Sequence, residues 1–162
     1  FYIYFNINMK KDIWGPYIWI FLHCFTIRIK DECFNEEKNN IIKYISQVCD
    51  NLPCPQCSIH AIEYLKKHRF KFIQTKQDLI QIIFNLHNDV NKRTKKPEFD
   101  FSKLHETYSK YHFQKLIIAY INFINNVNYG EKMMIYSMRR SESMKHLLNY
   151  FKENIEKYDI IV

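Results

Sequence analysis

Glycine is almost absent from this chain: its 162 residues contain only Gly15 and Gly130. A dinucleotide or triphosphate held in the Rossmann or P-loop manner needs a glycine-rich turn, so those binding modes are excluded. The long stretches between the four prolines carry apolar residues at helical spacing rather than in the alternation of strands. The chain is therefore predicted to be all-α, with little or no sheet.

Two helices are expected before Cys54. The first begins around Pro16, because proline suits the first turn of a helix, where its missing N–H costs nothing. A polar loop over residues 31–40 leads to the second helix, which starts near Ile41 and ends before Pro53. Apolar side chains at i, i+3, i+4 and i+7 indicate the inward faces.

Further helices are expected over residues 54–68, 76–93, 106–127 and 143–157, with Gly130 marking a break between the last two. The first four helices are long enough to form a compact bundle. Past residue 100 the composition changes to Tyr, Phe, Ile and Asn, without further Cys or Pro. We therefore expect one bundle followed by a helical extension.

The net charge of +7 does not by itself indicate a nucleic-acid partner. Lysines are spread over many predicted helix faces, and a solvated surface explains that distribution better than a track for phosphates. The basic clusters at residues 92–96 and 139–140 are short. We therefore expect no nucleic-acid binding.

Five cysteines are too few, and odd in number, for the disulfide framework of a secreted protein, so a reducing compartment is expected. No stretch approaches the roughly 20 apolar residues that span a bilayer, so no membrane span is expected. Residues 1–8 lack the basic start and cleavage site of a signal peptide, and Met9 is the expected true start.

Cys54 and Cys57 form a redox-competent pair, since two cysteines separated by two residues at a helix start can close a disulfide, and the helix N-terminus stabilises a thiolate. The alternative is a zinc site completed by Cys49 and His60, in a zinc-stabilised basic helical adaptor for an acidic partner or nucleic acid. Structural zinc sites usually pair two short clusters from separate segments, whereas these four residues are crowded together. A thioredoxin-type domain would require strand-helix-strand units.

Three segments strengthen the redox interpretation: WGPYIWIFLH at residues 14–23, LPCPQC at residues 52–57, and HNDVNK at residues 87–92, followed by Lys96-Pro97. In order and spacing they resemble the Erv/ALR family of FAD-linked sulfhydryl oxidases, and its viral members in particular. The resemblance covers roughly residues 12–101.

The resemblance implies a four-helix bundle with a short fifth helix that encloses FAD over residues 9–104, and a helical C-terminal extension over residues 105–162. Flat Trp and His rings suit the cofactor rings, Asn suits their polar edges, and Lys neutralises the pyrophosphate. No metal is expected. The implied flavin-binding residues are Trp14, Gly15, Trp19, His23, His87, Asn88, Asn91, Lys92 and Lys96.

The same resemblance gives the two cysteines different roles. A client thiolate attacks Cys54, and Cys57 passes electrons to FAD, which oxygen reoxidises to give hydrogen peroxide. The expected partners are client protein dithiols or a small thioredoxin-like carrier, together with molecular oxygen and a second copy in a homodimer. The expected location is the host cytoplasm, a virus factory or the virion.

Two departures from the cellular members lead to further expectations. Where those members carry a structural disulfide, this chain has Phe84 and Phe101, which are expected to contact each other instead. No cysteine follows Cys57, so we expect no C-terminal shuttle pair, while Cys33 and Cys49 stay open as alternatives. Cys24 is expected to be a buried small hydrophobic residue.

Overall fold

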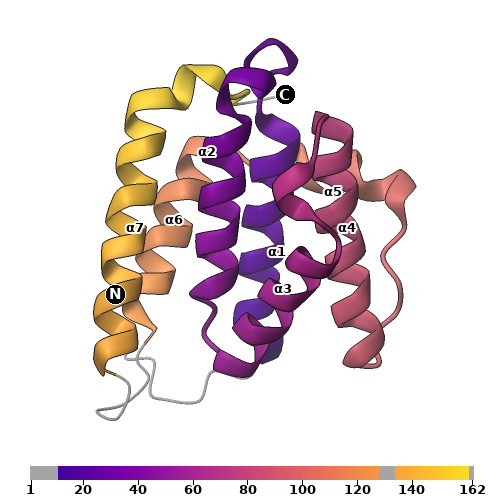
Figure 1. Cartoon of the computed structure of the whole chain (residues 1–162), viewed down its shortest axis with the longest axis vertical. Coiled ribbons are helices and arrows are strands. Elements are labelled where there is room, and N and C mark those ends of the chain that lie inside the picture. Colours follow the sequence, from indigo (N-terminus) through magenta and orange to yellow (C-terminus); the bar gives the residue numbers. More distant parts are fainter. Residues whose placement is uncertain (1–10, 128–133, 161–162) are drawn as a thin grey trace.

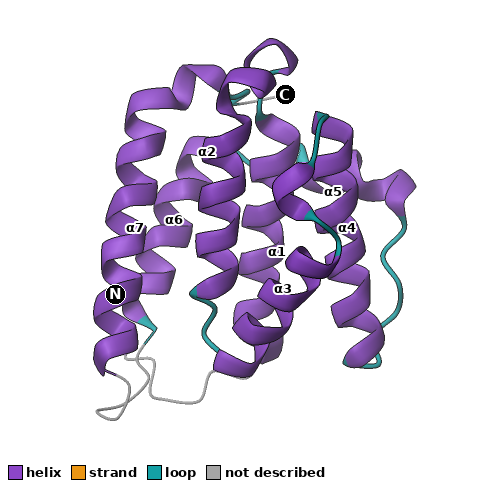
Figure 2. Cartoon of the chain, viewed as in Figure 1, coloured by secondary structure: helices purple, strands orange, loops and turns teal. Residues whose placement is uncertain are grey.

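The computed structural model describes residues 11–127 and 134–160, which are helices joined by short loops (Figure 2). Within these ranges the only strand-like pairing is an isolated bridge between Ile29 and Tyr158. The all-α prediction is confirmed. The expected start at Met9, residues 1–8 and the break at Gly130 lie outside the described residues. None of the helices in the described ranges is long and apolar enough to cross a bilayer.

The α-helices are α1 (Lys11–Arg28), α2 (Asp31–Asp50), α3 (Pro55–Lys67), α4 (Lys76–Arg93), α5 (Leu104–Tyr108), α6 (Phe113–Asn126) and α7 (Met134–Asn154). Three short 3-10 helices accompany them in the described ranges: η1 (Phe70–Phe72), η2 (Phe101–Lys103) and η4 (Ile155–Lys157). In Figure 1, α1 lies between α4 on one side and α6 on the other, and α7 packs outside α6. The short fifth helix, α5, contacts α1.

The first helix is the centre of the molecule. From Phe21 to Arg28 every residue of α1 is buried, on all sides of the helix. A helix that is covered all round must have partners all round, and α1 has α4, α5 and α6. Its described part begins at Lys11 rather than around Pro16, so Pro16 lies inside the helix, where it removes the hydrogen bond that a backbone N–H would make.

The third and fourth helices follow their predicted bounds closely because their caps are encoded locally. Thr75 Oγ1 accepts a hydrogen bond from the Asp78 N–H at 3.0 Å, and Asp78 Oδ2 accepts one from the Thr75 N–H at 2.9 Å. This reciprocal capping box fixes the start of α4. At the start of α3, Cys54 is the N-cap and Pro55 occupies the first turn.

The predicted polar loop over residues 31–40 is wrong, because α2 begins at Asp31. Polarity was a poor guide here, since Phe34 and Glu37 face the core and are only 4% and 2% exposed. The buried Glu37 carboxylate accepts hydrogen bonds from the Tyr150 hydroxyl at 2.8 Å and from the Lys157 ammonium. Partners from the C-terminal segment, Tyr150 and Lys157, thus stabilise Glu37 in the core and allow this polar stretch to form part of α2.

The single helix predicted over residues 106–127 is also wrong, since it divides into α5 and α6. The guanidinium of Arg28, only 1% exposed, donates to the carbonyl oxygens of Ser109 and Tyr111 between these helices. Helix α6 then starts anew, with His112 Nδ1 accepting from the Lys115 N–H at 3.4 Å. The last helix, α7, begins at Met134, earlier than predicted.

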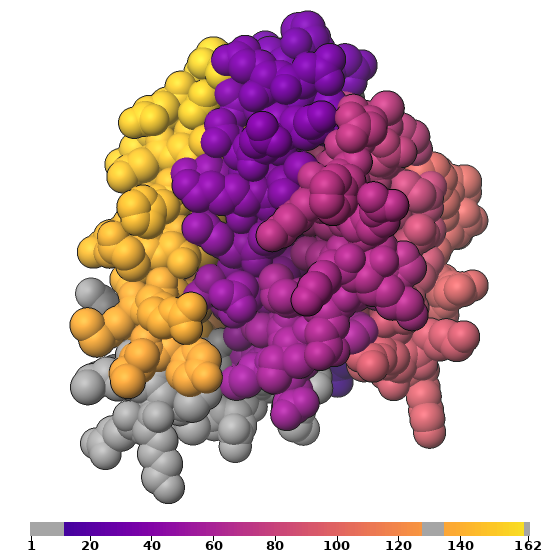
Figure 3. Space-filling model, viewed as in Figure 1, coloured from indigo at the N-terminus to yellow at the C-terminus, as the bar shows by residue number. Residues whose placement is uncertain are grey.

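The C-terminal helices share a core with the first helix. Phe151 of α7 contacts Phe21 and Phe25 of α1, with ring centroids 6.3 and 4.9 Å apart. The end of the chain is held in the same way, since the Asp159 N–H donates to the Arg28 carbonyl at 2.8 Å. In the space-filling view α2 lies between α7 and the segments that follow Cys54 (Figure 3).

The expected contact between Phe84 and Phe101 is confirmed. Their ring centroids lie 4.9 Å apart with an interplanar angle of 84°, an edge-to-face pair that joins α4 to η2. Phe84 is buried, and Phe101 covers it from the surface. Apolar packing therefore braces the junction at which cellular members of the resembled family carry a disulfide.

Candidate functional site

The centre of the site is a disulfide between Cys54 and Cys57, whose Cα atoms lie 5.1 Å apart. The Cys57 N–H donates to the carbonyl oxygen of Cys54 at 2.9 Å and to its Sγ at 3.2 Å. The Leu52 N–H donates to Ser58 Oγ at 3.1 Å, which fastens the preceding loop to the helix. The pair thus lies at the N-terminus of α3, where the helix dipole stabilises a thiolate.

A cavity of about 610 Å³ opens beside Cys57. Its mostly apolar walls come from α1, α3, α4 and α5, and its volume falls within the range of ligand-binding sites. Cys57 lines the cavity, whereas Cys54 does not. Six of the nine predicted flavin-binding residues also line it: Trp14, Gly15, Trp19, His87, Asn91 and Lys96.

One wall of the cavity is a stack of aromatic rings. The rings of Trp19 and His87 are 4.1 Å apart with an interplanar angle of 13°. Behind them, His23 Nε2 lies 2.9 Å from His87 Nδ1, and the His23 ring stacks on Tyr108 at 4.4 Å. His23, predicted to touch the flavin, therefore supports the wall from behind instead of lining it.

Both imidazoles in this wall are uncharged at neutral pH. Burial, together with the neighbouring His87, lowers the pKa of His23 to about 3. Burial likewise lowers the pKa of His87 to about 4, with Lys96 acting in the same direction. Neutral rings can stack on a cofactor ring and exchange hydrogen bonds without bringing charge into the apolar wall.

The polar end of the cavity is built around Asn91 and Lys96. Asn91 Nδ2 donates to Asn88 Oδ1 at 3.2 Å, and Lys96 Nζ lies 2.6 Å from Asp12 Oδ1. Asn88 does not line the cavity, because both ends of its amide bond the backbone of Phe99, at 3.0 and 2.8 Å. Lys92 is exposed and also lies outside the lining.

Several lining residues were missed by sequence reasoning. Arg93 lies one position after the predicted Lys92, so helical periodicity was the signal that would have found it. Tyr108 and Tyr111 come from the segment assigned to the extension, and no local motif marks them. His60 had been considered only as a zinc ligand, and Cys49 as a zinc ligand or a shuttle cysteine.

The residues present fit FAD. A Cβ built at Gly15 would meet no other atom within 4 Å, so the cavity is open in front of Gly15. Flat rings, a buried carboxamide and the cations Arg93 and Lys96 surround that space. They match the stacking, polar edges and pyrophosphate charge that the cofactor presents.

Two of the three remaining cysteines are poorly placed for thiol exchange. Cys49 is 1% exposed, and burial raises its pKa to about 12. Cys24 is fully buried, with a pKa that burial also raises to about 12, as expected for a small hydrophobic residue. Cys33, at the start of α2, is partly exposed and reduced.

The zinc alternative is not supported. Its four ligands would be Cys49, Cys54, Cys57 and His60. Two of these form a disulfide, and His60 bonds Asp89. Among the residues that the structure describes, no group of three or more His, Cys, Asp or Glu side chains is arranged to hold a metal ion.

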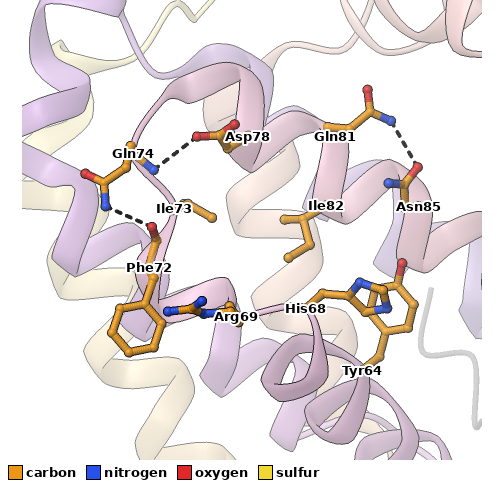
Figure 4. A pocket seen from close by; sticks show the side chains of 10 residues that line it. All are labelled: Tyr64, His68, Arg69, Phe72, Ile73, Gln74, Asp78, Gln81, Ile82 and Asn85. Atoms are coloured by element: carbon orange, nitrogen blue, oxygen red, sulfur yellow. Dashed lines mark hydrogen bonds between the residues drawn. The ribbon is translucent and has the colours of Figure 1, made fainter.

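A second hollow, of about 680 Å³, lies at the opposite end of α3 from the disulfide. Figure 4 shows Tyr64 beside His68 on one side, Arg69 and Phe72 on another, and the linked amides of Gln81 and Asn85 across from them. None of the predicted site residues lines it. Its exposed Phe72 provides a control position remote from the disulfide.

Comparison with known proteins identifies the group to which this arrangement belongs. The profile of the Erv1 / Alr family matches residues 16–109. The chain belongs to the Erv1 / Alr family. The match runs from Pro16 within α1 to just past α5, so it includes the disulfide and all of the cavity lining except Trp14, Gly15 and Tyr111.

Individual relatives agree. The chain is 30% identical over 118 residues to the FAD-linked sulfhydryl oxidase of an African swine fever virus isolate. The aligned residues cover 73% of this chain and 89% of the relative. It is 28% identical over 103 residues to the FAD-linked sulfhydryl oxidase ERV2 of Saccharomyces cerevisiae, covering 62% of this chain and 50% of the relative. No solved structure matches the chain significantly.

Proposed function

We propose that this protein is a flavin-dependent thiol oxidase that converts protein dithiols into disulfides and reduces oxygen to hydrogen peroxide. The observation that carries the proposal is the position of Cys57, which belongs to a disulfide at a helix N-terminus and also lines the cavity of about 610 Å³. Its viral and yeast relatives are named FAD-linked sulfhydryl oxidases. FAD is accordingly the cofactor.

The residues proposed to hold FAD would bind different parts of the cofactor. Trp19 and His87 offer a stacked, neutral aromatic surface, with Trp14 nearby in α1. Asn91 offers a carboxamide, and Lys96 a cation, to the polar parts of the cofactor. His23 and Asn88 support this set from behind, through His87 and Asn91. Lys92 would act only through long-range charge.

In the proposed reaction a client thiolate attacks Sγ of Cys54, forming a mixed disulfide, and the Cys54–Cys57 bond breaks with its electron pair left on Cys57. The second client thiolate attacks the client sulfur of the mixed disulfide, which releases the client disulfide and leaves Cys54 reduced. The bound flavin supplies the two-electron chemistry that reoxidises the cysteine pair and passes the electrons to oxygen. Cys57 faces the cofactor cavity, and Cys54 meets the client.

A hollow of about 360 Å³ beside the disulfide suits a client polypeptide. Leu52 and Pro55, which flank Cys54, line one side, and Tyr136 and Arg139 of α7 line another. A chain segment lying there would bring a cysteine to Cys54. We propose that protein dithiols, or a small thioredoxin-like carrier, bind in this way, and that residues 105–162 extend the oxidase unit of residues 9–104.

We further propose that the protein works as a homodimer in the host cytoplasm, a virus factory or the virion. Three free cysteines, two of them fully buried, support a reducing location for its folding. The homodimer rests on family membership alone, and sedimentation velocity of the purified protein tests it. A monomer at micromolar concentration would contradict it.

Oxygen uptake tests the activity. The purified chain should be yellow, contain no stoichiometric zinc, and consume oxygen when given dithiothreitol. Cys54→Ser should abolish oxidation of a protein dithiol, and Cys33→Ser, the matched control, should leave it intact. A colourless zinc protein would contradict the proposal.

A further inference from the structure

His60 and Asp89 join α3 to α4 beside the disulfide. Nε2 of His60 lies 2.8 Å from Oδ2 of Asp89, and their side chains are 19% and 38% exposed. His60 follows Cys57 by three residues in α3, and both residues line the proposed flavin cavity. Since residues at i and i+3 are neighbours on a helix surface, the imidazole and Cys57 share one face of α3.

From this arrangement we propose that His60, oriented by Asp89, stabilises the Cys57 thiolate that forms when the disulfide opens. The inference rests on the proposed function and deepens it, because it assigns the group that prepares the second sulfur for electron transfer. Asp89 is a positioning residue, since it acts through the imidazole.

The proton movement follows from the hydrogen bond. The Asp89 carboxylate accepts from the Nε2–H of His60, which leaves Nδ1 as the second protonation site of the ring. When the Cys54–Cys57 bond breaks, its electron pair stays on Cys57. The proton that the client thiol released on forming its thiolate is then held on Nδ1 rather than on the Cys57 sulfur, and a thiolate-imidazolium pair results.

The other ionisable groups around His60 do not replace it. On α3, Glu63 lines the cavity and the Tyr64 ring lies 6.5 Å away, but neither is cationic. On α4, Arg93 Nε lies 4.0 Å from Asp89 and thus shares that carboxylate. Elsewhere in the lining, His87 is neutral, Lys96 pairs with Asp12, and Cys49 of α2 is a thiol.

Cys49 illustrates what this cavity does to a thiol without such a partner. Burial, together with the neighbouring Asp50, raises the pKa of Cys49 to about 12, so the group stays protonated at neutral pH. Cys57 is less buried and lies at a helix N-terminus. The helix dipole and His60 together oppose the effect of burial on its sulfur.

The experiment measures the pKa of Cys57 directly. In a Cys33→Ser/Cys54→Ser background of the full chain, the rate of Cys57 alkylation by iodoacetamide is followed from pH 5 to pH 10 by peptide mass spectrometry. Adding His60→Gln should raise the apparent pKa by about one unit, so that alkylation at pH 7 slows about tenfold. Asp89→Asn should give a smaller shift in the same direction.

The matched control is His68→Gln, because His68 caps the far end of the same helix, where it stacks on Tyr64. It should leave the Cys57 profile unchanged. An unchanged profile in both His60→Gln and Asp89→Asn, with circular dichroism like that of the parent, overturns the inference. If His60→Gln fails to fold, Asp89→Asn and His60→Lys decide: Asp89→Asn should raise the pKa, and His60→Lys, which keeps a cation, should hold it low.

Alkylation requires neither flavin turnover nor oxygen, so the two proposals fail separately. A protein without oxidase activity whose Cys57 profile still shifts would contradict the proposed function and preserve this inference. An active oxidase whose Cys57 profile does not shift would support the proposed function and contradict this inference.

Discussion

The imidazole of His87 lies flat on the indole of Trp19, with ring centroids 4.1 Å apart. The pair comes from α4 and α1, so the surface it offers exists only when these helices are packed together. Trp19 keeps part of its surface accessible, and both rings line the cavity beside Cys57. A stacked pair held in this way is a preformed platform for a cofactor ring.

Trp19→Ala should weaken FAD binding about 3- to 10-fold, since an aromatic pair contributes ~0.5–1.5 kcal/mol beyond its buried area. Titration of flavin-free protein with FAD, followed by flavin fluorescence, measures the change. Trp19→Phe should bind nearly as well as the parent, and Phe72→Ala, in the remote hollow, should be indistinguishable from it. Unaltered affinity in Trp19→Ala would remove Trp19 from the site.

Phe84 and Phe101 should stabilise the fold as a pair. A double-mutant cycle with both residues changed to Ala should give a coupling free energy of about 0.5–1.5 kcal/mol. Urea unfolding of the parent, the two single variants and the double variant supplies the four free energies. A coupling near zero would mean that the edge-to-face contact contributes nothing beyond separate burial.

Phe151→Ala should destabilise the whole protein, because this ring lies between α1, α6 and the C-terminal Tyr158. A loss of about 3–5 kcal/mol in the free energy of unfolding is expected for a buried phenylalanine. Phe72→Ala is the matched control: its side chain is 64% exposed, and the loss should stay within about 0.5 kcal/mol. Equal effects would show that the C-terminal helices do not share the core.

Stability should fall between pH 7 and pH 5. The folded-state pKa values of His23 and His87, about 3 and 4, lie below the unfolded value of 6.5, so the unfolded state binds more protons in this interval. Their contribution is complete above pH 6.5 and is lost as the pH falls toward the folded values. The free energy of unfolding in urea should drop by roughly 2–4 kcal/mol.

The His23→Gln variant should show a shallower decline over the same interval. His146→Gln changes an exposed residue that is 3.4 Å from Glu142, and should follow the parent curve. A parent protein equally stable at pH 5 and pH 7 would mean that these imidazoles are not buried in neutral form.

Local signals in the sequence predicted the parts of the fold that depend on local structure. The bounds of α4 follow from a capping box at Thr75, and those of α3 from Cys54 and Pro55 at its start. Long-range contacts decided the rest. Arg28 separates α5 from α6 by bonding carbonyls 81 and 83 residues away, which no periodicity in residues 106–127 could reveal.

The same division applies to the site. The motifs of residues 14–23, 52–57 and 87–92 supplied the cavity residues that lie within them. Tyr108 and Tyr111 reach the cavity from beyond these motifs, and only the packing of α5 on α1 brings them there. His23 and Asn88 belong to the motifs but support their neighbours, a distinction that spacing alone does not make.

The central claim is that electrons leave the reduced Cys54–Cys57 pair through Cys57 and enter a flavin in the adjoining cavity, which restores the disulfide. Anaerobic addition of dithiothreitol to the flavin-loaded protein, followed at the visible flavin band, tests it most directly. The parent and Cys33→Ser should bleach rapidly, whereas Cys57→Ser should bleach at least about a hundredfold more slowly, since only direct reduction by the reagent remains. Bleaching of Cys57→Ser at the parent rate would contradict the account.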